Sequence, residues 1–139
     1  MIHQELSNEI IGAFYTVYNR LGYGFLEKVY ENSMKIELEK RGVSAQQQRK
    51  LKVYYDSHLV GEYCADIVVE DRVILELKTV DAIASEHEAQ LINYLRATEI
   101  ELGLLLNFGP KPEFVRRIFT NDKKGFTPKI PVENHPANL

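Results

Sequence analysis

The chain has 139 residues, of which 45% are hydrophobic and 27% charged, a composition that is typical of a globular protein and excludes a disordered or fibrous chain. One hydrophobic core is normal at this length, so we expect a single domain over residues 1–120 and a proline-containing C-terminal tail over residues 121–139. The formal net charge of −3 argues against non-specific binding of a polyanion through overall charge.

The first ten residues of the chain lack the basic start and apolar stretch of a signal peptide, and no later run approaches the roughly 18 apolar residues of a membrane span. We therefore expect a cytoplasmic protein with no membrane partner.

The N-terminal third of the chain is patterned for helices. Apolar residues at helical spacing predict an amphipathic helix over residues 6–21, which the break at residues 22–24 ends. A second helix is predicted over about residues 25–40, with Glu27 in its first turn.

Residues 46–79 carry the alternation of a three-stranded antiparallel meander. A turn is expected at residues 56–58, followed by strands over residues 59–69 and 73–80. Cys64 lies in this run, where a small buried thiol is common, and we assign it no catalytic role. Because it is the one cysteine of the chain, it excludes an internal disulfide and a multi-cysteine zinc site.

The rest of the chain predicts a further helix over about residues 82–98, a buried strand over residues 103–108 and another strand over residues 114–119. All five prolines lie beyond residue 109, so regular structure should thin out from Pro110 onward, especially after Thr120. This order of elements predicts an α/β domain in which a mixed β-sheet is flanked by helices.

One strand of the meander holds an acidic and a basic side chain together. Side chains alternate in a strand, so Glu76 and Lys78 share a face. If residues 70–72 form a three-residue loop, Val69 pairs with Val73, and Asp66 then lies opposite Glu76 with Cβ atoms about 4.5–5.5 Å apart. A two-residue loop would send Asp66 to the other face.

Two neighbouring carboxylates repel each other, and charged residues deep in an apolar strand seldom lack a partner. A divalent cation resolves this conflict, and a set of oxygen ligands suits Mg²⁺, or Mn²⁺, better than zinc. The competing interpretation is an exposed strand whose acidic residues are solvated or ion-paired. The apolar residues on both flanks of Glu76 weigh against it.

These residues resemble a known family. Asp66, followed ten residues later by Glu76-Leu77-Lys78, is similar to the D…ExK signature of the PD-(D/E)XK nuclease superfamily, although Ala65 stands where the eponymous proline would be. Residues 24–30 (GFLEKVY) resemble the GxxExxY motif that names one bacterial and archaeal family of this superfamily. Residues 90–94 (QLINY) resemble the QxxxY element, and residues 103–108 resemble the strand that follows it. The matches span about residues 5–118.

The resemblance implies a restriction-endonuclease-like fold and a phosphodiesterase mechanism. Asp66, Glu76 and the backbone carbonyl of Leu77 would bind the metal, and Glu27 would approach from the second helix as a ligand or through a bound water. Lys78 would orient or help to deprotonate the attacking water and offset charge in the transition state.

Gln90 and Tyr94 are four residues apart and share a helix face, from which they could reach the metal or the scissile strand. A half-buried core aromatic is an equally good interpretation of Tyr94, and for His87, one turn earlier, we favour a partly exposed helix histidine. Tyr30 is expected to pack or to support Glu27.

The function predicted in this way is Mg²⁺-dependent cleavage of nucleic acid, with DNA favoured over RNA and a homodimer left open as the form that encloses a duplex. The alternatives are an inactive nuclease-fold module that binds nucleic acid or a protein partner, and a metal-binding hydrolase built on a chance pattern. Positive charge for a nucleic-acid partner could come from a basic run near the C-terminus, although a solubilising tail explains that run equally well; the run comprises Lys111, Arg116, Arg117, Lys123, Lys124 and Lys129.

Overall fold

The structure is a computed structural model, and it describes residues 1–124. Two helices, α1 (Gln4–Leu21) and α2 (Glu27–Lys40), precede the strands β1 (Ala45–Tyr55), β2 (His58–Val69) and β3 (Val73–Lys78). Helix α3 (Ser85–Ala97), β4 (Leu102–Phe108), β5 (Pro112–Ile118) and a short 3₁₀ helix (Asn121–Lys123) complete the described range.

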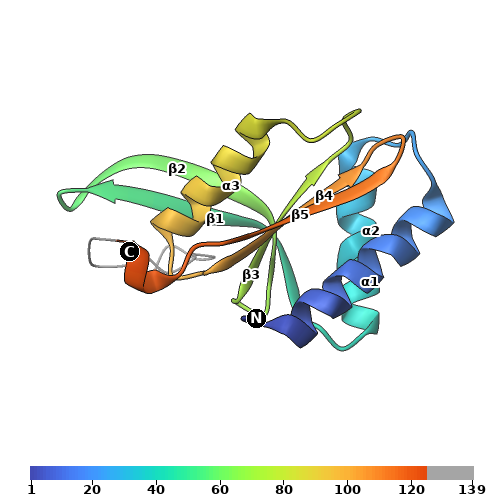
Figure 1. Cartoon of the computed structure of the whole chain (residues 1–139), viewed down its shortest axis with the longest axis horizontal. Coiled ribbons are helices and arrows are strands. Elements are labelled where there is room, and N and C mark those ends of the chain that lie inside the picture. Colours follow the sequence, from blue (N-terminus) through green and yellow to red (C-terminus); the bar gives the residue numbers. More distant parts are fainter. Residues whose placement is uncertain (125–139) are drawn as a thin grey trace.

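Within this range the five strands form one sheet in the order β1-β2-β3-β4-β5. The β3–β4 pair is parallel and the other neighbouring pairs are antiparallel. Helices α1 and α2 cover one face and α3 covers the other (Figure 1). The predicted α/β architecture, a mixed sheet flanked by helices, is confirmed.

Strand β3 is the centre of the fold because it is buried on both faces. Leu75 and Leu77 join the core under α1 and α2, which includes Phe14 and Tyr30. Ile74 packs on the other face with residues of α3. A continuous apolar run is what a strand covered on both sides requires, so the one acidic residue inside β3, Glu76, is the exception that needs a physical explanation.

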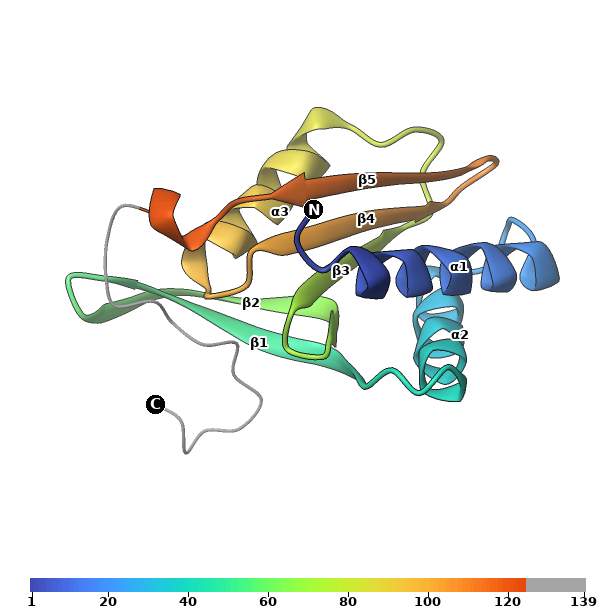
Figure 2. The same ribbon diagram turned by 60° about the horizontal axis from the view of Figure 1, so that its bottom comes forward.

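The sheet forks between β2 and β3. These strands pair over three positions, from Val69–Val73 to Ile67–Leu75, whereas β1 and β2 stay paired along the whole hairpin to Tyr55–His58. Beyond the Ile67–Leu75 pair, β3 continues along β4 while the β1–β2 hairpin projects away from the rest of the sheet (Figures 1 and 2). We call this point of divergence the fork.

Several boundaries differ from the predictions. Helices α2 and α3 begin two to three residues later than expected, at Glu27 and Ser85. Strand β5 lies in the region where regular structure was expected to thin out; proline is tolerated at the first residue of a strand, and Pro112 holds that position. Most of the predicted tail, residues 125–139, lies outside the described residues.

Cys64 is exposed, so the prediction of a buried thiol is wrong. It pairs with Lys50 in the projecting part of the β1–β2 hairpin, which lies beyond the fork. This part of the hairpin is not sandwiched between layers of helices, and a strand pattern alone does not reveal that. No helix within residues 1–124 combines the length and the apolar character needed to span a membrane.

The segment that follows β3 is fastened to the end of β4. The buried Asn107 side chain accepts a hydrogen bond from the Val80 N–H (3.0 Å) and donates one to the Val80 carbonyl (2.9 Å). Gly109 passes so close to the same peptide that a Cβ atom there would lie 2.0 Å from the Val80 carbonyl oxygen. Asn107 is also the β4 partner of Lys78, so these contacts hold the exit of β3 in place.

We predict that Gly109→Ala destabilises the protein, because the backbone of Val80 must move to admit the methyl group; overpacking of this kind costs about 1–3 kcal/mol. The matched control is Gly12→Ala in α1, where the added Cβ would contact a side-chain nitrogen of Arg41, at the flexible end of that residue. Urea denaturation of both variants checks this. Equal stabilities of the two variants would show that the backbone after β3 does not depend on the close approach of Gly109 to Val80.

Candidate active site

Asp66 and Glu76 lie next to each other at the fork. The Asp66 N–H donates to Glu76 Oε2 (3.0 Å), and the Leu77 N–H donates to Asp66 Oδ2 (2.8 Å). Paired strands would satisfy such N–H groups with ladder carbonyls, but here the ladder has already ended. The two carboxylates take the place of those carbonyls. The predicted Val69–Val73 register and the closeness of residues 66 and 76 are confirmed; we call these two residues the carboxylate pair.

The carboxylate pair is buried, and the nearby positive charge offsets its negative charge only in part. Burial first, and then the charge of Asp66, raises the pKa of Glu76 to about 8. Burial also raises the pKa of Asp66, and the charges of Glu31 and Glu27 add to this effect. The ammonium of Lys78, two residues beyond Glu76, lowers the pKa of both carboxyl groups without reversing these shifts.

The donor chemistry of this site fits a hard divalent cation. Two carboxylates with only one neighbouring lysine leave negative charge that Mg²⁺ or Mn²⁺ would neutralise, and Mg²⁺ is commonly held by one or two carboxylates together with waters. Within residues 1–124, however, no three or more His, Cys, Asp or Glu side chains lie close enough together to hold a metal ion. The side-chain ligands gathered at the fork are therefore the carboxylate pair alone.

Glu27 is predicted from the sequence to bind the metal directly or through a bound water. Glu27 is exposed at the start of α2, and its charge raises the pKa of both members of the carboxylate pair, so it faces the site electrostatically. It does not complete a three-carboxylate cluster with them. Its role at the metal, direct or through a water, stays a prediction.

The GxxExxY segment has a structural explanation that centres on Tyr30. The Tyr30 hydroxyl donates to the Gly22 carbonyl and accepts from the Phe25 N–H (3.2 Å), and its ring stacks on Phe108 with centroids 4.5 Å apart. These contacts fix the loop that leads into α2. Tyr30 therefore supports the position of Glu27, in line with the packing role expected for it.

Glu31, a buried carboxylate one helical turn after Glu27, is not among the site residues predicted from the sequence. Its side chain accepts hydrogen bonds from Gln47 (2.6 Å) and Gln48 (2.9 Å) and pairs with Lys28 (3.0 Å). Gln48 has a left-handed backbone, with a φ of 52°, where β1 passes the fork. The i,i+4 spacing to Glu27 was an available signal, because such residues share a helix face.

Gln90 and Tyr94 approach the site from α3. The Gln90 amide donates to the Tyr94 hydroxyl (3.0 Å). Burial raises the pKa of Tyr94 to about 12, and the charges of Glu76 and Asp66 act in the same direction, so the hydroxyl keeps its proton and can donate it. His87 accepts a hydrogen bond from the Ala84 N–H (3.1 Å) and so caps α3, which agrees with the structural interpretation favoured for it.

Much of the C-terminal basic run is engaged in the fold. The Arg116 guanidinium donates to the Ser7 hydroxyl (2.8 Å), Arg117 pairs with Glu88, and the buried Lys124 ammonium donates to two backbone carbonyls. Lys129 lies outside the described residues. The hypothesis that this run forms a basic surface for nucleic acid therefore loses three of its members.

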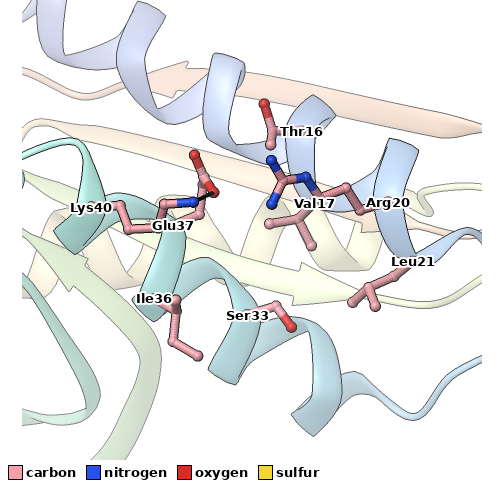
Figure 3. A pocket seen from close by; sticks show the side chains of 8 residues that line it. All are labelled: Thr16, Val17, Arg20, Leu21, Ser33, Ile36, Glu37 and Lys40. Carbon is pink, nitrogen blue, oxygen red and sulfur yellow. Dashed lines mark ion pairs between the residues drawn. The ribbon is translucent and has the colours of Figure 1, made fainter.

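Two cavities of the described part of the chain differ in their relation to the candidate site. One, of about 180 Å³, lies between α1 and α2, where Arg20 and Lys40 line it and Lys40 pairs with Glu37 (Figure 3). The other, of about 660 Å³, lies between the β1–β2 hairpin and α3 and includes Gln90 and Tyr94 in its wall. The second cavity therefore shares residues with the candidate site, and the first does not.

The mixed sheet with helices on both faces is consistent with a restriction-endonuclease-like α/β domain. The family model of the PD-(D/E)XK nuclease superfamily matches residues 4–118, and the chain belongs to that superfamily. The GxxExxY family within it stays a prediction. The crystal structure of SSO0001 is similar in fold, with a TM-score of 0.54 and 16% identity over 69% of this chain and 51% of that one. No curated protein matches the chain.

We predict that the metal-free protein becomes less stable as pH rises from about 5 to about 8. The ordinary pKa of a glutamate is 4.5 and the folded value for Glu76 is about 8. Between these values the folded protein holds a proton that the unfolded chain has released, so the free energy of unfolding falls with increasing pH. Thermal melting in EDTA measures this effect.

Glu76→Gln is the matched variant, because a neutral amide removes the titration while keeping nearly the same volume. Its melting temperature should fall less over the same pH range. Mg²⁺ added at about pH 8 should raise the melting temperature of the wild type more than that of the variant, since a ligand of the folded state stabilises it by mass action. Parallel pH curves for the two proteins would contradict the assignment.

Proposed function

We propose that this protein is a Mg²⁺-dependent nuclease that hydrolyses phosphodiester bonds of nucleic acid, with DNA as the favoured substrate and Mn²⁺ as an alternative cofactor. The observation that carries the proposal is the carboxylate pair, held side by side at the fork by backbone N–H groups. Membership of the PD-(D/E)XK nuclease superfamily supports it.

Asp66 and Glu76, with the backbone carbonyl of Leu77, are the groups proposed to hold the metal, and Glu27 is proposed to contribute through a water. When bound, the ion would act as a Lewis acid toward a phosphate oxygen. Neutral backbone donors hold the carboxyl groups without forming an ion pair, so a bound cation would take the place of the proton that burial favours on Glu76. Burial of Glu76 keeps competing water away from it.

Lys78 is proposed to position the attacking water and to offset the negative charge that grows on the phosphate. It follows Glu76 by two residues, so the alternation of the strand places both side chains on one face of β3. The contacts of Asn107 with Val80 restrain the backbone immediately beyond it. A lysine on restrained backbone meets the requirement for preorganised charge.

Gln90 and Tyr94 are proposed to bind the substrate rather than to exchange protons with it. With its pKa near 12, Tyr94 remains a phenol at neutral pH and can donate a hydrogen bond to a phosphate oxygen. Gln90 orients that hydroxyl through their mutual hydrogen bond. Tyr94→Phe should therefore weaken substrate binding more than it lowers kcat.

The decisive variants are Lys78→Ala and Asp66→Asn. Loss of a preorganised charged group typically costs about 100- to 1000-fold in rate, so each should reduce Mg²⁺-dependent cleavage by at least that factor. Lys50→Ala is the matched control, because Lys50 is an exposed strand lysine in β1. Linear, nicked and single-stranded DNA and RNA serve as substrates in a gel assay.

The alternative, an inactive nuclease-fold module that binds nucleic acid or a protein, makes a different prediction. The wild type would then cleave none of these substrates with Mg²⁺ or Mn²⁺, and the two variants would bind nucleic acid as the wild type does. Calorimetric titration with Mn²⁺ separates the cases further, because the nuclease proposal requires metal binding that Asp66→Asn weakens. Cleavage that persists in Asp66→Asn would also overturn the proposed mechanism.

A further inference from the structure

The larger cavity has a strand-side wall, which includes Tyr63, that the proposed mechanism does not use. It lies between β1, β2 and α3, with a volume of about 660 Å³, within the usual range of small-molecule sites. On the strand side Leu51, Val53 and Tyr63 line it. We call it the tyrosine pocket.

The ring of Tyr63 is partly exposed to solvent and packs against neighbouring residues. The residue is 47% exposed, yet its ring contacts that of Tyr94, with centroids 5.5 Å apart. Gly61, two residues earlier in β2, lies under the ring, since a Cβ there would come within 3.6 Å of it. The ring is therefore held by its neighbours while part of it stays open. Two contacting rings leave no room for a third between them, so a planar ligand must stack on the exposed side of Tyr63.

The helix side of the pocket supplies polar groups. Gln90, Asn93 and Arg96 line it along α3, opposite the apolar strand wall. A nucleobase has the same combination of properties, an apolar face and an edge of hydrogen-bond donors and acceptors. An ordinary apolar groove would lack this polar edge.

The pocket adjoins the candidate active site through residues that both share. Tyr63 and Asp66 are three residues apart on β2, and Gln90 and Tyr94 belong both to the pocket wall and to the α3 side of the site. A nucleic-acid strand whose phosphate lies at the carboxylate pair would thus have a neighbouring base beside Tyr63.

Attraction between the protein and the phosphates of a nucleic acid is weak here, because the net charge is −3 and much of the basic C-terminal run is engaged in the fold.

We propose that the tyrosine pocket binds one unpaired nucleobase next to the scissile phosphate, stacked on Tyr63, so that the substrate is single-stranded or locally unpaired nucleic acid. The inference rests on the proposed nuclease function. A paired base inside a duplex is covered on both faces by its neighbours and cannot stack on a tyrosine. Stacking on aromatic side chains is the usual basis of single-strand binding, and it works with any base.

The test uses Tyr63→Trp, because the chain contains no tryptophan and the new residue is then a unique fluorophore at the stacking position. A Lys78→Ala background with Mg²⁺ limits turnover. The probes are a thymine 12-mer, an abasic chain with the same number of phosphates and a blunt duplex. The control is Tyr55→Trp in the same background, at the exposed tip of the β1–β2 hairpin.

We expect the thymine 12-mer to quench the fluorescence of Tyr63→Trp, and the abasic chain and the duplex to leave it unchanged. The fluorescence of Tyr55→Trp should respond to none of the three probes. In anisotropy titrations Tyr63→Ala should bind the thymine 12-mer about tenfold more weakly, as expected for one stacked base. Tyr63→Phe should bind normally, and Tyr63→Leu should be as weak as Tyr63→Ala because it keeps apolar volume without a ring. Tyr63 is half-exposed, so these variants should fold, and thermal melting checks this.

The possible failures can be told apart. If the wild type cleaves nucleic acid but Tyr63→Trp responds equally to the abasic chain, or Tyr63→Ala binds the 12-mer normally, the stacking inference is wrong and the nuclease proposal stands. If the wild type cleaves the duplex and spares the single strand, the substrate class is wrong. If it neither binds nor cleaves any probe, both proposals fail together.

Discussion

Two hydrogen bonds at the fork determine the character of the whole site. The Asp66 N–H donates to Glu76, and the Leu77 N–H donates to Asp66, so each carboxylate replaces a carbonyl that the interrupted ladder would have supplied. An ion pair would have fixed these side chains by cancelling their charge. Neutral backbone donors fix them without cancelling any charge, and burial therefore raises the pKa of both carboxyl groups. A buried, immobile and uncompensated carboxylate pair is destabilising alone and favourable beside a cation.

The rest of the fold maintains this arrangement. The fork requires that β3 leave β2 and stay with β4, and Asn107 secures this by binding both polar groups of the Val80 backbone. Helix α2 brings Glu31 and its glutamine partners to the side of β1, while α3 brings Gln90 and Tyr94 across the opposite face. The carboxylate pair thus lies where two layers of helices meet a sheet that opens between them.

The parts of this site that follow from local rules could be predicted from sequence, and the parts that depend on distant contacts could not. Strand alternation and a three-residue loop were enough to place Asp66 beside Glu76. The environment of Glu31 depends on a left-handed residue in a strand 17 positions away, Gln48, for which the sequence offers no turn signal. Arg116 is engaged by Ser7 across 109 residues, so no local rule removes it from a basic surface.

The charge of the molecule limits how it can hold a substrate. A protein with a net charge of −3 and an acidic site repels a polyanion at long range, and a metal at the carboxylate pair could offset this only locally. On the proposed function, further affinity must come from contacts that do not depend on charge, and Tyr63 is an exposed ring adjoining the candidate site that can supply them. Stacking requires an unpaired base, so the same scarcity of positive charge that weakens binding to any nucleic acid would favour a frayed or single strand over a duplex.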